Sequence, residues 1–104
     1  ELLGLGLIDK ADVKNEDPNW PAYKKYFMHG TSHHMGLDTH DYGLLWEPMK
    51  ANMVFTVEPG IYIPDEGFGI RLEDDVVIQE SGEPFNLMRN IPIEAEEIEN
   101  IMNS

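Results

Sequence analysis

The chain of 104 residues contains no cysteine. This absence excludes a disulfide scaffold, a cysteine-ligated zinc finger and a thiol nucleophile. Long hydrophobic runs are also lacking, because the apolar stretch at residues 2–8 is too short to span a bilayer and is interrupted by Gly4 and Gly6. The stretch is not preceded by a basic segment, so we expect no signal peptide and no membrane association. On this ground the sequence predicts a cytoplasmic protein.

Basic residues are few: 7 Lys and Arg stand against 20 Asp and Glu, which gives a net charge of −13. Such a charge argues against binding to nucleic acid or to an anionic membrane surface, but it suits cation binding where carboxylates converge. The length predicts one domain with a modest core. Because the chain begins at Glu1 and not at Met, we expect a fragment or a processed product.

The first part of the chain predicts little regular structure. Residues 1–8 are expected to form the end of a helix or a packed apolar segment, and residues 9–21 a polar connection with two prolines. Residues 22–28 fit either a short helix or a strand. Residues 29–45 hold all four histidines together with three glycines, so a regular helix is not expected there.

A β-hairpin is predicted in the second half of the chain. Residues 54–63 and 69–79 are rich in β-branched side chains, and the turn-like tetrapeptide at 64–67 lies between them. Beyond the hairpin, we expect a turn at Gly82, a short strand at residues 85–89 and a final helix at residues 92–102, with Pro92 in its first turn.

The predicted hairpin places two carboxylates side by side. A loop of four residues pairs Ile63 with Phe68, and the same register sets Glu58 opposite Glu73. Like charges at facing positions destabilise a sheet unless one acid is protonated, both are solvated, or a cation lies between them. The opposite face is apolar and is expected to pack against a helix or another sheet; it carries Phe55, Val57, Pro59, Ile61, Ile63 and their cross-strand partners.

Four histidines lie within twelve residues, from His29 to His40. One neutral imidazole added to the two carboxylates would give a mixed nitrogen and oxygen site, of the kind that binds Mn, Fe, Co or Zn. Reasoning from the residues alone does not choose among the four histidines.

Three sequence blocks, taken together, resemble a known family. They are HGTSHHMGLDTHD at 29–41, VFTVEPGIYI at 54–63 and GIRLEDDVVI at 69–78. In this order and spacing they resemble the C-terminal half of Xaa-Pro aminopeptidase (aminopeptidase P), one of the pita-bread metallopeptidases. The resemblance implies an α+β fold: half of a pita-bread (creatinase/aminopeptidase-like) fold, an antiparallel β-sheet with flanking helices. Residues 1–104 would then be the C-terminal portion of the catalytic domain, without its N-terminal half.

The resemblance also implies a metal site. His33, Glu58 and Glu73 would be metal ligands, with Glu73 bridging two ions, and the complete enzyme would hold two Mn ions with a bridging hydroxide. That hydroxide would attack the peptide bond that precedes proline in a peptide with proline in second position.

The remaining catalytic roles are likewise implied by the resemblance. Glu58 would also transfer protons, and His40 would stabilise the substrate or the tetrahedral intermediate. His29 would line the substrate site, and Arg71 would orient the bridging carboxylate or a neighbouring group.

Two aspartate ligands of the family come from its N-terminal half, and no residue of this chain matches them. We therefore expect the chain alone to bind metal weakly and to be inactive. Apolar surface left bare would favour self-association into a homo-oligomer.

Three other functions remain open on the sequence. A prolidase-type dipeptidase is the nearest relative in chemistry. A non-catalytic pita-bread module that binds a partner or peptide is the second alternative. An acidic β-rich binding domain with incidental histidines is the third.

Overall fold

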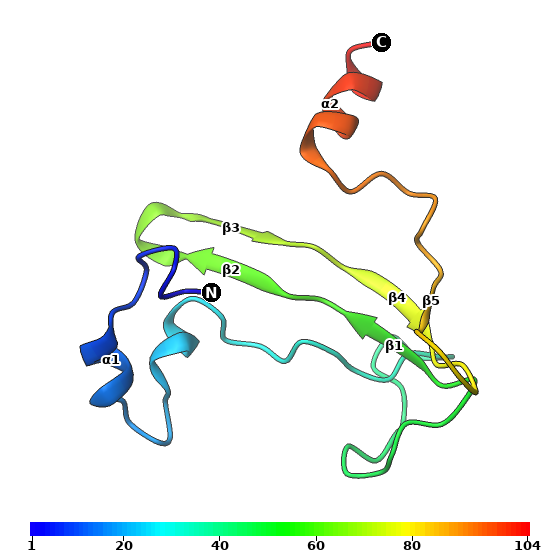
Figure 1. Ribbon diagram of the computed structural model, residues 1–104, viewed down its shortest axis with the longest axis horizontal. Helices are drawn as coiled ribbons and strands as arrows, with labels where there is room; N and C mark the ends of the chain where they lie inside the picture. Colours follow the sequence, from blue (N-terminus) through cyan, green and yellow to red (C-terminus); the bar gives the residue numbers. More distant parts are fainter. The chain divides into compact units, whose positions relative to one another are not determined.

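The computed structural model describes residues 1–104 and contains short helices and antiparallel strands, as an α+β fold requires. The chain divides into two compact units, one made of Glu1–Gly30 with Gly60–Arg71 and the other of Thr31–Pro59 with Leu72–Ser104. Figure 1 labels the elements along the chain. None of the helices is long and apolar enough to cross a bilayer.

The first unit begins with a helical turn that ends at Gly6. The amide of Gly6 donates to the carbonyl of Leu3 and that of Leu7 to the carbonyl of Leu2, at 3.2 and 3.1 Å. With Gly6 at φ 73°, this is the Schellman pattern that closes helices. Residues 1–8, predicted as the end of a helix or a packed apolar segment, thus form a hydrogen-bonded turn outside the helices of the structure.

The predicted polar connection at 9–21 is wrong in one respect, because it contains the helix α1 (Lys10–Lys14). Asp9 and Asp12 form a capping box, in which each carboxylate accepts from the other residue's amide at 2.8 Å. Further along, the helical alternative at 22–28 is the observed one, as the 3₁₀ helix η1 (Ala22–Lys25).

The hairpin of the first unit pairs β2 (Gly60–Ile63) with β3 (Phe68–Arg71), antiparallel and with Ile63 opposite Phe68. The connection is the short 3₁₀ turn η2 (Pro64–Glu66), followed by Gly67 at φ 72° (Figure 1). This left-handed conformation favours glycine, which has no Cβ to clash. The predicted turn and register are both confirmed.

The second unit is built on a sheet in the order β1-β4-β5. β1 (Val54–Val57) pairs antiparallel with β4 (Asp74–Val77), with Val54 opposite Val77, and β4 pairs with β5 (Phe85–Asn86). Gly82, at φ 80°, lies in the turn before β5 as predicted. The strand itself is shorter than the predicted 85–89. The buried side chains of this unit are Phe55 and Thr56.

The expectation that the apolar hairpin face packs against another element is wrong for half of its residues, which are exposed. Phe55 is buried, but Val57, Phe68, Ile70 and Leu72 are between 43% and 64% exposed. The apolar surface of these four side chains is therefore in contact with water.

The final helix α2 spans Ala95–Met102 and begins later than predicted, so Pro92 lies outside it. Glu94 is the N-cap residue, and no side chain caps the first turn. The acidic residues Glu96 and Glu97 in that turn suit the positive end of the helix dipole.

The Gly67 turn generates a prediction about stability. Gly67→Ala should lower the free energy of unfolding by about 1–2 kcal/mol, because a Cβ disfavours the left-handed conformation. Urea unfolding followed by circular dichroism measures the change. Glu66→Ala, at an exposed position of the same turn, is the matched control and should change the stability little. Equal stabilities of Gly67→Ala and the parent chain would contradict the role given to the turn.

Candidate metal centre

The register of the sheet brings Glu58 and Glu73 together. β1 ends at Val57 and β4 begins at Asp74, where these two residues are paired. The next pair in the same register is Glu58 and Glu73. The amide of Leu72 donates to the carbonyl of Pro59 at 3.2 Å, so the two segments of the hairpin remain hydrogen-bonded just beyond the carboxylates. Pro59 interrupts the strand without inserting a residue, because β2 and β3 continue in the same register.

The segment 31–35 lies on the other side of β1. The carbonyl of Thr31 accepts from the amide of Glu58 at 2.8 Å, and the carbonyl of His33 accepts from the amide of Thr56 at 3.0 Å. The amide of Met35 donates to the carbonyl of Val54 at 3.0 Å. These bonds follow antiparallel pairing and set His33 opposite Thr56. Since Thr56 and Glu58 are two residues apart, His33 lies on the same face of the sheet as Glu58.

His33, Glu58 and Glu73 form one group of potential ligands. One ligand atom from each residue lies within 4.8 Å of the others. The side chains of His33 and Glu58 are largely enclosed, at 22% and 14% exposure, and Glu73 is exposed. Reasoning from the residues alone did not choose among the four histidines, and the structure brings His33, the one that the family resemblance implies, beside the two carboxylates.

The ring of His33 is oriented for a ligand. Its Nδ1 lies 2.9 Å from the carbonyl oxygen of His34. A carbonyl only accepts, so Nδ1 carries the proton and Nε2 of the neutral ring has a free lone pair. Nε2 lies 3.9 Å from Oε2 of Glu58, which is too long for a hydrogen bond.

The donor set fits a divalent cation. Nitrogen and oxygen ligands bind at about 2.0–2.2 Å, so donors on opposite sides of one ion are about 4 Å apart. Ligand atoms within 4.8 Å of one another are close to this spacing. One imidazole and two carboxylates suit borderline ions of the first transition row.

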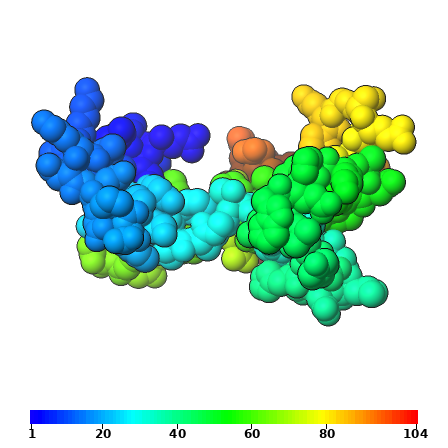
Figure 2. Space-filling model, turned by 90° about the horizontal axis from the view of Figure 1, so that it is seen from below, coloured from blue at the N-terminus to red at the C-terminus, as the bar shows by residue number.

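His40 lies beside this group, on the loop that follows the ligand segment. Its ring centroid is 4.5 Å from that of His33, in an edge-to-face arrangement. Asp41 closes the loop, because its amide donates to the carbonyl of His34 at 3.1 Å and its carboxylate accepts from the amide of Leu37 at 3.0 Å. The continuation of the loop as far as Met49 exposes several large apolar side chains and is drawn in teal to green in Figure 2.

The other two predicted site residues belong to the first unit. His29 Nε2 lies 2.7 Å from the hydroxyl of Tyr62, and its Nδ1 lies 2.7 Å from the carbonyl of Gly30. By the same reasoning Nδ1 donates, and the Tyr62 hydroxyl donates to Nε2. Arg71 is the last residue of β3, opposite Gly60.

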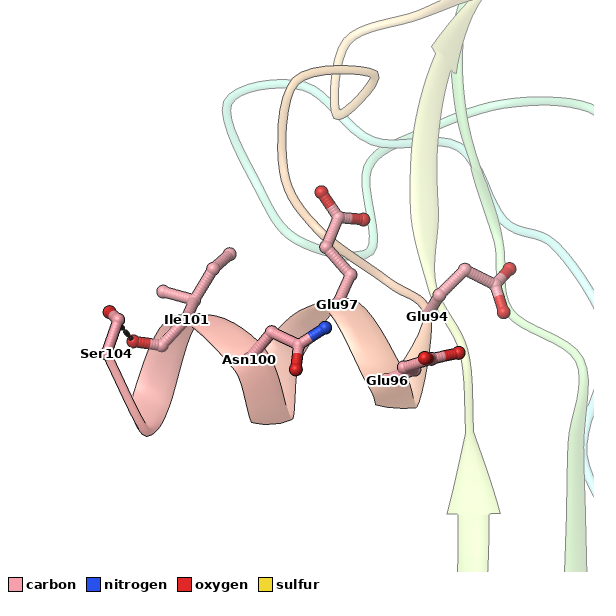
Figure 3. Close-up of a pocket in the computed structure, with 6 residues that line it drawn as sticks. All are labelled: Glu94, Glu96, Glu97, Asn100, Ile101 and Ser104. Carbon is pink, nitrogen blue, oxygen red and sulfur yellow. Dashed lines mark hydrogen bonds between the residues drawn. The ribbon is translucent and has the colours of Figure 1, made fainter.

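A second acidic cluster lies at the start of α2, around a shallow hollow of the surface (Figure 3). Glu94, Glu96 and Glu97 line it, and the Ser104 hydroxyl donates to the carbonyl of Ile101 at 2.7 Å. Figure 3 shows the carboxylates of Glu96 and Glu97 pointing in different directions. Their ligand atoms do not form a converging group, unlike those of His33, Glu58 and Glu73.

Two contact residues were not singled out from the sequence. Thr56 contacts the backbone of His33, and Tyr62 contacts the ring of His29. Strand alternation already placed both on the face that carries Glu58. The sequence did not predict that residues 29–35 lie beside these strands, because this segment is far from the hairpin in sequence and has no regular hydrophobic period.

Comparison with known proteins supplies the family. The profile of metallopeptidase family M24 matches residues 7–80. Xaa-Pro aminopeptidase of Escherichia coli is 43% identical to this chain over 97% of its length, and human Xaa-Pro aminopeptidase 3 is 37% identical over 96%. The match covers 25% and 22% of those two relatives, so the chain spans about a quarter of their length.

A solved structure agrees with this assignment. Aminopeptidase PepP of Pseudomonas aeruginosa superposes with a TM-score of 0.79 at 35% identity, over 98% of this chain and 26% of that one. Aminopeptidase P has the pita-bread fold that the sequence predicted. The chain belongs to metallopeptidase family M24 and has a partial α+β fold of the pita-bread type.

Proposed function

We propose that the protein is a metal-dependent aminopeptidase that releases the N-terminal residue from peptides with proline in second position. The convergence of His33, Glu58 and Glu73 within 4.8 Å carries this proposal. The names of the relatives support the specificity, since both of those compared are Xaa-Pro aminopeptidases. In this proposal residues 1–104 form the C-terminal portion of a pita-bread catalytic domain.

The three ligands act together on one cation. The Nε2 lone pair of His33 and the carboxylates of Glu58 and Glu73 hold the divalent cation. When bound, the cation supplies Lewis acidity toward the peptide carbonyl and lowers the pKa of water. Manganese is the ion we propose, because this mixed nitrogen and oxygen set suits it and the family resemblance favours it.

The residues of the chain supply the remaining chemistry. In this proposal Glu58 accepts a proton from the attacking water and returns it to the leaving amine. In this proposal His40 donates a hydrogen bond to the oxygen on which negative charge develops, and the position of its ring beside that of His33 supports this role. The roles given to His29 and Arg71 stay predictions.

Substitution of the ligands tests the proposed function. In the protein that carries this sequence, His33→Ala, Glu58→Gln and Glu73→Gln should each weaken Mn²⁺ binding by more than about 100-fold, because loss of a ligand should exceed the effect of an outer contact. Each should also abolish most cleavage of a peptide with proline in second position. Isothermal titration and a peptide hydrolysis assay measure the two effects.

The control for this series is Glu80→Gln, which makes the same chemical change at an exposed position outside the ligand group. It should leave both metal binding and hydrolysis unchanged. Unaltered Mn²⁺ affinity in the three ligand variants would refute the metal centre. Cleavage restricted to dipeptides that end in proline would instead favour a prolidase.

The chain of 104 residues tested by itself should bind Mn²⁺ weakly and should not cleave Xaa-Pro peptides. The reason is that one imidazole and two carboxylates are fewer protein ligands than a pair of metal ions requires. Isothermal titration of the isolated chain, with the same hydrolysis assay, measures this. Tight binding together with cleavage would overturn the expectation.

A further inference from the structure

Thr56 is the most enclosed side chain of the molecule. It is 1% exposed and is the one buried polar residue, beside the buried aromatic Phe55 in the same strand. A buried hydroxyl is costly unless it forms a hydrogen bond. The Oγ1 atom of Thr56 accepts from the backbone amide of His33 at 3.1 Å. The buried hydroxyl is therefore hydrogen-bonded to the residue that carries the imidazole ligand.

Both backbone polar groups of His33 are bound by Thr56. The carbonyl of His33 accepts from the amide of Thr56 at 3.0 Å, while the amide of His33 donates to the Thr56 side chain. In a regular antiparallel pair the second bond would go to the carbonyl of Thr56. The hydroxyl takes that place here, and the pairing of residues 31–35 with β1 is an isolated bridge between His34 and Phe55, not a strand.

The ring of His33 is held separately from its backbone. Its Nδ1 donates to the carbonyl of His34, which fixes the ring so that Nε2 remains available beside Glu58. Thr56 thus fixes where the residue lies, and His34 fixes how the ring is turned. Removing the hydroxyl would leave the partly enclosed amide of His33 without its acceptor, which favours displacement of the segment.

We infer that Thr56 is a positioning residue for the metal ligand His33, acting through the hydrogen bond from the His33 amide to its hydroxyl. The inference rests on the proposed metal centre. It goes beyond it by assigning a role in metal affinity to a side chain that is not a ligand. Contacts of this kind around a metal site typically change affinity by about 10–100-fold when removed.

The test compares Thr56→Val with Thr56→Ser. Valine has the shape of threonine without the acceptor, whereas serine keeps the hydroxyl. Mn²⁺ is titrated into the full chain, up to millimolar concentration so that weak binding is measurable, and broadening of the His33 ring signals is followed by NMR. Thr56→Val should bind Mn²⁺ at least about tenfold more weakly, and Thr56→Ser should retain most of the affinity.

Two controls separate positioning from general stability. Thr39→Val makes the same chemical change at an exposed threonine of the histidine segment. Val76→Ala removes packing from β4 but leaves the hydrogen bonds of His33 in place. Neither should reduce Mn²⁺ affinity as Thr56→Val does, even where urea unfolding shows that Val76→Ala is equally destabilised. Hydrogen exchange of the His33 amide should accelerate in Thr56→Val alone.

The outcomes are distinguishable. If the unsubstituted chain shows no Mn²⁺ broadening at His33, the proposed metal centre fails, and this inference fails with it. If the unsubstituted chain binds and Thr56→Val binds equally well, the metal centre stands and the positioning role is overturned. Equal loss of affinity in Val76→Ala and Thr56→Val would also overturn it, because the effect would then follow stability.

Discussion

Antiparallel register is the constraint on which the candidate metal centre depends. Side chains alternate between the two faces of a sheet, so a slip of one residue would turn one of the two carboxylates to the opposite face. The pairs Val57 with Asp74 and Gly60 with Arg71 belong to one uninterrupted register on either side of Glu58 and Glu73. The proline after Glu58 ends β1 but does not shift this register. The opposition of two acids is thus set by backbone pairing, because like charges at facing positions do not attract each other.

The hairpin and its two carboxylates could be predicted because the information is local. A four-residue turn with a glycine at its end, flanked by β-branched strands, determines which residues face each other. The choice of His33 could not be predicted in this way. It depends on residues 31–35 lying beside β1, which begins 19 positions after Met35, and the hydrogen bonds of this segment leave no periodic signal in its sequence. Family resemblance supplied that residue before the geometry did.

The elements that sequence reasoning missed have local causes of another kind. The helix α1 depends on two aspartates that cap each other, a side-chain effect that outweighs the turn-forming composition around it. At the other end, Pro92 fits a first helical turn, yet the helix begins only at Ala95. The apolar hairpin face was expected to be covered by a helix or another sheet, because the alternation of polar and apolar residues along the strands shows which face is apolar. Alternation carries no information on whether a partner element is present.

His34 illustrates how a residue without a chemical role is nevertheless constrained. Its carbonyl accepts from both the His33 ring and the amide of Asp41, while its own ring packs 4.4 Å from that of Phe55. The two hydrogen bonds at this position use only the peptide oxygen, which every amino acid possesses. A flat hydrophobic ring in place of the imidazole would preserve both the packing and the two bonds. Variation among aromatic side chains here is therefore compatible with an unchanged centre.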